Sequence, residues 1–283
     1  MATTFTSIGS IFLLFILSIL ASPYLSQLEV VFFLLALIIN YAFFKSIITG
    51  NYSQVDELWT IVPTFFLYHF NHWSPRGILM FCLTLIWGFR LSFNFWRKGG
   101  YRGLEDYRWE QLRQIITNKY LWFLFNVIFI STYQSILLML ICSPVYFEDQ
   151  SSLKVKDMVL GVLYLGFVML ETIADRQQWD FQSEKKALIA KGLKPKGNFI
   201  TSGLFRYSRH PNFFAEQCIW WILYAFTDSW NLSIVGPILL TLLFQGSTTF
   251  TEYLSKKKYP EYAEYQKTTA RLIPWFPGKA KDL

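Results

Sequence analysis

The chain has 283 residues, of which 53% are hydrophobic and 19% aromatic, whereas only 16% are charged. Soluble globular proteins carry about 25% charged residues, so this composition excludes an intrinsically disordered chain and disfavours an ordinary soluble enzyme. The 15 glycines and 10 prolines are sparse and follow no period, which excludes a fibrous repeat.

Eight apolar runs predict membrane-spanning helices, because such a helix needs roughly 20 predominantly apolar residues. The first run lacks the basic start and the cleavage motif of a signal peptide, so we expect it to be retained. The runs are continuous rather than alternating, which disfavours a β-barrel. In chain order they cover residues 7–22, 29–48, 58–75, 77–96, 120–147, 157–174, 213–227 and 231–251.

The basic residues predict the topology. Of the 26 lysines and arginines, 21 fall within residues 97–119, 171–212 and 252–283. Under the positive-inside rule these stretches face the cytoplasm, and the C-terminus lies there as well. Loop topology and anionic lipid then explain the net charge of +7, so we expect no nucleic-acid partner. The predicted fold is an all-α, polytopic bundle of seven or eight transmembrane helices in a lipid bilayer.

Ionisable residues in or beside the first apolar runs are candidates for function. Asp56 and Glu57 precede the third run, where they either cap a helix or stand at the mouth of a cavity. Arg90 lies inside the fourth run, three residues after Trp87. A charge at membrane depth is costly, so we expect Arg90 to pair with an acid or with ligand oxygens. Residues 105–109 (Glu-Asp-Tyr-Arg-Trp) fit an interfacial helix or part of a site.

A second acidic pair lies near the end of the sixth run. Glu171 and Asp175 are four residues apart and therefore share one helix face. Two like charges on one face need cations or hydrogen-bond donors, which arginines or a polar ligand would supply. The three cysteines, by contrast, lie in apolar runs without a Cys-x-x-Cys motif, so we expect packed thiols and no metal site. They are Cys82, Cys142 and Cys218.

The segment 203–216 (Gly-Leu-Phe-Arg-Tyr-Ser-Arg-His-Pro-Asn-Phe-Phe-Ala-Glu) carries the strongest signal. Pro211 favours a helix start, which brings Arg206, Arg209 and His210 to one helix end. The guanidinium group of arginine and the free N–H groups of a helix N-terminus both bind phosphate groups. Glu216, one turn further on, needs a partner such as a ribose hydroxyl, an amide or an arginine. The alternative is an ordinary positive-inside loop with an interfacial proline.

Tyrosines at three-residue spacing mark the C-terminal tail. Tyr259, Tyr262 and Tyr265 would lie on one helix face, and the sequence Ile-Pro-Trp-Phe-Pro follows at 273–277. Two interpretations stay open for this tail. It packs against lipid headgroups, or it forms a lid over a cofactor.

These motifs together resemble the steroid 5α-reductase-like superfamily. Residues 56–59, 87–91 and 105–109 are most similar to its uncharacterised branch, and the resemblance covers about 29–277. The Arg-His-Pro-Asn stretch at 209–212 is also similar to isoprenylcysteine and phospholipid methyltransferases.

The resemblance implies an extra transmembrane helix at 1–28, before a membrane catalytic domain at 29–283. It implies an oxidoreductase that uses NADPH on the cytoplasmic side to reduce a carbon–carbon double bond of a hydrophobic, steroid- or lipid-like substrate. For a eukaryotic host it implies the endoplasmic reticulum. The catalytic residues would be Asp56, Glu57, Trp87 and Arg90. The residues around the cofactor would be Glu171, Asp175, Arg206, Tyr207, Arg209, His210, Asn212, Glu216 and Glu252.

Trp87 departs from the family pattern, because the steroid reductases have a tyrosine there that helps to protonate the substrate oxygen. An indole N–H donates a hydrogen bond but is no acid. Two other functions stay open at this point. One is an S-adenosylmethionine-dependent lipid or isoprenoid methyltransferase, and the other is a non-catalytic lipid-binding membrane protein.

Overall fold

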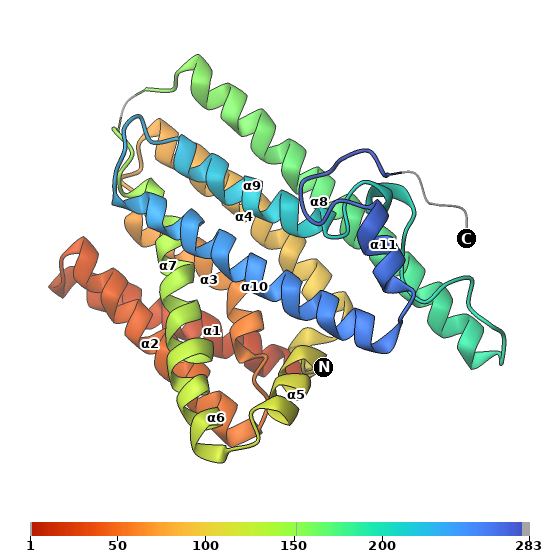
Figure 1. Cartoon of the computed structure of the whole chain (residues 1–283). Helices are drawn as coiled ribbons and strands as arrows, with labels where there is room; N and C mark the ends of the chain where they lie inside the picture. The colour runs from red at the N-terminus through yellow and green to blue at the C-terminus, as the bar shows by residue number, and fades with distance from the viewer. Residues whose placement is uncertain (1, 151, 279–283) are drawn as a thin grey trace. The chain divides into compact units, whose positions relative to one another are not determined.

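The computed structural model describes residues 2–150 and 152–278, with side chains from Ser7 onward. Helices and their connections make up this part of the chain, and it contains no strand, so the predicted all-α fold is confirmed. The chain divides into two compact units, and Figure 1 labels their helices. Unit 1 comprises Met1–Gly161 and Leu223–Leu239, and unit 2 comprises Val162–Ile222 and Leu240–Leu283. The boundary at residue 28 stays a prediction.

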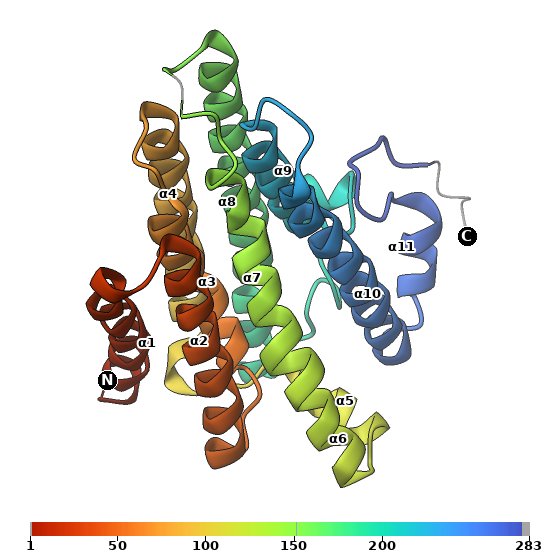
Figure 2. The same cartoon turned by 90° about the vertical axis from the view of Figure 1, so that its left-hand side faces the viewer.

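Unit 1 is built around α3. This helix packs against α2, α4 and α7, and most of its side chains are buried. Figure 2 shows α2 lying between α1 and α7. A π-helical segment, Asn126–Tyr133, joins α6 to α7 into one continuous helix. The helices are α1 (Ala2–Ala21), α2 (Gln27–Thr49), α3 (Gln54–Phe70), α4 (Pro75–Arg97), α5 (Tyr107–Ile115), α6 (Lys119–Phe125) and α7 (Gln134–Cys142).

Local sequence signals explain where the helices of unit 1 begin. Ser26 and Glu29 form a capping box at the start of α2, with the Ser26 N–H donating to the Glu29 carboxylate at 2.7 Å. Ser74 caps α4 by accepting from the Gly77 N–H at 2.9 Å, and Pro75 occupies the first helical position. Glu29, the acid at the start of the second apolar run, therefore caps a helix.

Unit 2 contains most of three helices and a short fourth one. α8 (Val155–Ala190) has 36 residues and is therefore about 54 Å long, which exceeds the thickness of a membrane. It ends before Gly192, whose φ of 71° is left-handed. α9 (Pro211–Ala225) begins at the predicted proline, and α10 (Val235–Lys258) and α11 (Tyr262–Thr268) follow.

Six segments of the described chain are long and apolar enough to cross a membrane. The helices that form from the third and seventh predicted runs, α3 and α9, have only 17 and 15 residues. They are therefore about 26 and 22 Å long. These lengths are shorter than the roughly 30 Å of a hydrocarbon core. A multi-pass membrane protein in a lipid bilayer is thus confirmed. The six are Ser7–Tyr24, Gln27–Thr49, Pro75–Arg97, Lys119–Val145, Val155–Ala190 and Leu232–Lys258.

A buried charge cluster ties the start of α4 to other parts of unit 1. The Arg76 side chain is fully buried and contacts the equally buried Asp157 through Nε at 3.1 Å and Nη2 at 3.2 Å. It also donates to Asp149 and, at 3.1 Å, to Asp228. Lys154 donates to Asp228 at 2.7 Å. Arg76 therefore neutralises a carboxylate that has no access to water.

Replacing Arg76 by methionine should destabilise the protein strongly. Arg76→Met leaves Asp157 buried without its cation, which costs about 3–5 kcal/mol of unfolding free energy. Thermal unfolding of the detergent-solubilised chain measures this, with the exposed Arg102→Met as control. The interpretation is wrong if both variants melt at the wild-type temperature. A second change, Asp157→Asn, should restore part of the loss.

Candidate functional site

The carboxylate of Glu252 gathers four hydrogen-bond donors in unit 2. Its Oε1 accepts from Arg209 Nε at 2.7 Å and from His210 Nε2 at 3.0 Å. Its Oε2 accepts from Arg209 Nη2 at 3.1 Å and from Gln266 Nε2 at 2.8 Å. Three residues predicted to lie together, from the start of α9 and from α10, are thus in direct contact.

The same cluster holds the C-terminal strap, which we define as Tyr262–Gly278. Arg209 Nη1 donates to the carbonyls of Gln266, at 3.1 Å, and Thr269. The backbone N–H of Arg209 donates to Ala270 O at 2.9 Å, and Trp275 N–H donates to Tyr207 O at 2.9 Å. The strap therefore lies along residues 203–210. Every donor group of the Arg209 side chain is engaged by Glu252 or by the strap.

Three further predicted carboxylates are buried on α8 and α9. Glu171, Asp175 and Glu216 are 5%, 6% and 6% exposed. Asn212 Nδ2 donates to Asp175 at 3.4 Å, and Trp220 Nε1 donates to Glu216 at 2.8 Å. Carboxylate oxygens accept hydrogen bonds well from the hydroxyl and amide donors of a polar ligand.

Arg206 and Tyr207 lie on the surface of unit 2. Both residues are exposed, and Arg206 has no hydrogen-bond or ion-pair partner among the described residues. An anionic ligand could therefore reach Arg206 without breaking a contact, whereas Arg209 would have to exchange a bond to Glu252 or to the strap.

In unit 1, Glu57 forms a buried ion pair that the sequence analysis missed. Its carboxylate lies 2.7 Å from Lys45 Nζ, which also donates to Tyr41 OH at 2.7 Å and to Ser7 Oγ at 3.0 Å. Burial raises the pKa of Glu57, and Lys45 opposes that rise. The lone lysine at the end of an apolar run was a usable signal for this partner.

Asp56, the neighbour of Glu57, has a different environment. It accepts a hydrogen bond from Trp109 Nε1 at 3.1 Å. Burial, reinforced by the nearby Asp106 carboxylate, raises the pKa of Asp56 to about 6, although Arg108 opposes the rise. Asp56 is therefore the predicted catalytic carboxyl that can change its protonation near neutral pH.

The other two predicted catalytic residues lie on α4. Trp87 is fully buried, and Arg90 is half-buried one turn later. Their catalytic roles stay predictions. Among the described residues, no three histidine, cysteine or acidic side chains form a group that could hold a metal ion. Cys82, Cys142 and Cys218 are free cysteines.

Comparison with known proteins identifies the family. A family described as "Protein of unknown function (DUF1295)" matches residues 42–269. The chain belongs to this family. It is also 38% identical over 265 residues to an uncharacterized protein of Schizosaccharomyces pombe, with 84% of this chain and 77% of that protein covered. No solved structure matches the chain. Membership of an uncharacterised family is thus confirmed, and the link to steroid reductases stays a prediction.

Asp56 should make stability depend on pH. Its folded pKa of about 6 lies above the ordinary value of about 3.9, so the folded state binds more protons between these values. Stability should therefore fall as pH rises through this window. Asp56→Asn should flatten that slope, by at most about 1.4 kcal/mol per pH unit. Unfolding measured from pH 4 to 7 tests this, with the exposed Glu110→Gln as control. Equal slopes in the wild type and Asp56→Asn would contradict it.

Neutralising Glu252 should loosen the C-terminal strap. Glu252→Gln removes the charge that orients Arg209 and His210, so trypsin should cut after Lys267 and Arg271 several times faster. Mass spectrometry of timed digests measures the rates. Glu264→Gln serves as the control, since this residue pairs at 2.7 Å with the exposed Lys267 within the strap. Unchanged cleavage in Glu252→Gln would show that the strap is held by other contacts.

Proposed function

We propose that the protein is a membrane-embedded, NADPH-dependent reductase of a carbon–carbon double bond in a steroid- or lipid-like substrate. The supporting observation is that unit 2 brings Arg209 and His210 onto Glu252 and buries the predicted acids Glu171, Asp175 and Glu216. The resemblance noted above supplies the reaction class, and with it a role in lipid metabolism and, in a eukaryote, an endoplasmic-reticulum location.

The carboxylates would orient the cofactor. NADPH, when bound, supplies the hydride. Glu171, Asp175 and Glu216 would accept hydrogen bonds from ribose hydroxyls and from the carboxamide, which limits the orientations of the reacting ring. Arg206 would take part of the phosphate charge, since a guanidinium matches phosphate oxygens in geometry. The apolar helices would exclude water from the reacting atoms.

The proton that completes the reduction is assigned to Asp56. Glu57 is already paired with Lys45, and the indole of Trp87 is no acid. Because its pKa is raised to about 6, Asp56 lies closer than an ordinary carboxyl to the pKa that suits a general acid near neutral pH.

The buried carboxylates also suit a cationic cosubstrate, which favours one rival function. A sulfonium would be attracted by Asp175, Glu216 and Glu171, and it would leave the Arg209–Glu252 pair undisturbed. An S-adenosylmethionine-dependent lipid or isoprenoid methyltransferase is therefore the second candidate. The third, a non-catalytic lipid-binding protein, requires neither cosubstrate.

Carboxylate replacement should test whether these acids bind NADPH. Asp175→Asn and Glu216→Gln should each weaken NADPH binding about tenfold or more, because hydrogen bonds to charged groups are worth about 1.5–3 kcal/mol. Isothermal titration of the full chain in nanodiscs measures the affinity. Asp180→Asn is the matched control, since its side chain is 62% exposed on the same helix.

A product assay completes this test. The wild type is incubated with NADPH that carries deuterium at the transferred position, together with a lipid extract. Deuterium in a lipid product supports the reductase. Binding of S-adenosylhomocysteine without binding of NADPH would favour the methyltransferase, and binding of neither would leave the lipid-binding protein.

A further inference from the structure

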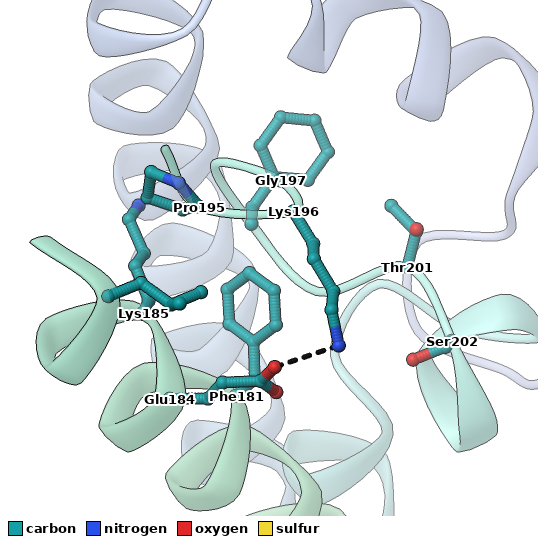
Figure 3. Close-up of a pocket in the computed structure, with 10 residues that line it drawn as sticks. Phe181, Glu184, Lys185, Pro195, Lys196, Gly197, Thr201 and Ser202 are labelled. Atoms are coloured by element: carbon teal, nitrogen blue, oxygen red, sulfur yellow. Dashed lines mark ion pairs between the residues drawn. The ribbon is translucent and has the colours of Figure 1, made fainter. Parts of the chain in front are cut away.

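Unit 2 contains a cavity that none of the sequence motifs marked. It has a volume of about 280 Å³ and lies between the C-terminal end of α8 and the segment 195–202 (Figure 3). This volume is close to the lower limit of roughly 300 Å³ for small-molecule pockets. The cavity therefore suits one ring system with a substituent rather than a whole dinucleotide.

Part of the cavity lining is polar. Lys196 Nζ lies 2.9 Å from the Glu184 carboxylate, with the side chains 83% and 55% exposed. Figure 3 shows the lysine extending toward Glu184, with Thr201 and Ser202 also lining the cavity. Exposed ion pairs contribute little to stability. An incoming anion could therefore take Lys196 from Glu184 at small cost.

Two hydroxyl groups of the cavity lining are also available. The side chains of Thr201 and Ser202 have no hydrogen-bond partner within the described part of the chain, and both residues are exposed. Lys185, by contrast, is engaged by the carbonyl of Asn198 and by Tyr259 OH at 3.1 Å. Lys196 is thus the cavity lysine that can move onto a ligand.

Two aromatic side chains also line the cavity. Phe181 and Phe199 both line it. The ring of Phe199 lies 4.9 Å from that of Tyr262 and 5.6 Å from that of Tyr265, so the strap helps to hold it in place. Stacking a nucleobase on an aromatic side chain is favourable and tolerates any base.

The charge around the cavity favours an anion. Five lysines lie within residues 185–196, against Glu184 just before them. A phosphate monoester accepts charge-assisted hydrogen bonds from a lysine, and it can also accept hydrogen bonds from two hydroxyl groups. The cavity thus offers a ring site and a phosphate site within one small volume.

We propose that this cavity binds the phosphorylated adenosine end of the cofactor. The adenine would lie against Phe181 and Phe199, and the 2′-phosphate would bind Lys196 with the hydroxyls of Thr201 and Ser202. This inference rests on the proposed NADPH-dependent function. It makes Lys196 the residue that separates NADPH from NADH.

The test uses the purified full chain and compares ligands that differ by one phosphate. The wild type should bind NADPH at least tenfold more tightly than NADH, and 2′,5′-ADP at least tenfold more tightly than 5′-AMP. Lys196→Ala should weaken NADPH and 2′,5′-ADP about tenfold and leave NADH unchanged. Phe181→Leu should weaken all four. Lys194→Ala, two residues before Lys196 and outside the cavity lining, is the matched control.

The outcomes separate this inference from the proposed function. If NADPH binds and Lys196→Ala leaves its affinity unchanged, the cavity assignment is wrong and the reductase stands. If 2′,5′-ADP binds through Lys196 and no deuterium is transferred, the cavity assignment stands and the reductase fails. If neither nucleotide binds, both are wrong. Equal competition by inorganic phosphate or by phosphatidic acid vesicles would replace the adenosine assignment with a free phosphate or a lipid headgroup.

Discussion

Unit 2 depends on the hydrogen bonds that the Glu252 carboxylate accepts. Glu252 lies near the end of a transmembrane helix and is 7% exposed, so donors within the protein must stabilise its charge. Arg209, His210 and Gln266 are these donors. Because these donors come from the start of α9 and from the C-terminal strap, one buried charge connects α9, α10 and the chain end. The need to stabilise this buried charge also fixes the positions of Arg209 and His210, which belong to the proposed cofactor site.

Buried carboxylates in unit 1 are also stabilised by partners within the protein. Arg76 pairs with the buried Asp157, and Lys45 pairs with Glu57. In each pair, the two charges neutralise each other at hydrogen-bond distance, which suits a structural role. Glu57, an acid predicted from sequence to be catalytic, takes part in one of these ion pairs, and its catalytic role stays a prediction. In unit 2, the carboxylates of Asp175 and Glu216 accept hydrogen bonds from Asn212 and Trp220. Because these two acids and Glu171 are all buried there, the proposed ligand binding is placed in unit 2.

Much of the fold could be predicted from local patterns. The apolar runs became helices because a backbone in lipid must satisfy its own hydrogen bonds, and Pro211 marked the start of α9 because its ring fixes φ. The contact of Arg209 and His210 with Glu252 was only implied by the family resemblance. The pairing of Lys45 with Glu57 had a weak signal in the lone lysine. Arg76 and the cavity beside Lys196 had none, since their partners are brought near only by folding.

The sequence by itself determined that the chain is a helical, multi-pass membrane protein, because composition and run length decide how a segment partitions into lipid. It also determined which side chains are too polar to be buried at no cost. Only the tertiary structure decided which of them neutralise one another. Arg209, an expected cofactor ligand, also anchors the C-terminal strap, because its three guanidinium nitrogens donate four hydrogen bonds to Glu252 and the strap carbonyls. Pairing energies depend on distances of a few ångströms, and sequence spacing does not encode such distances between remote segments.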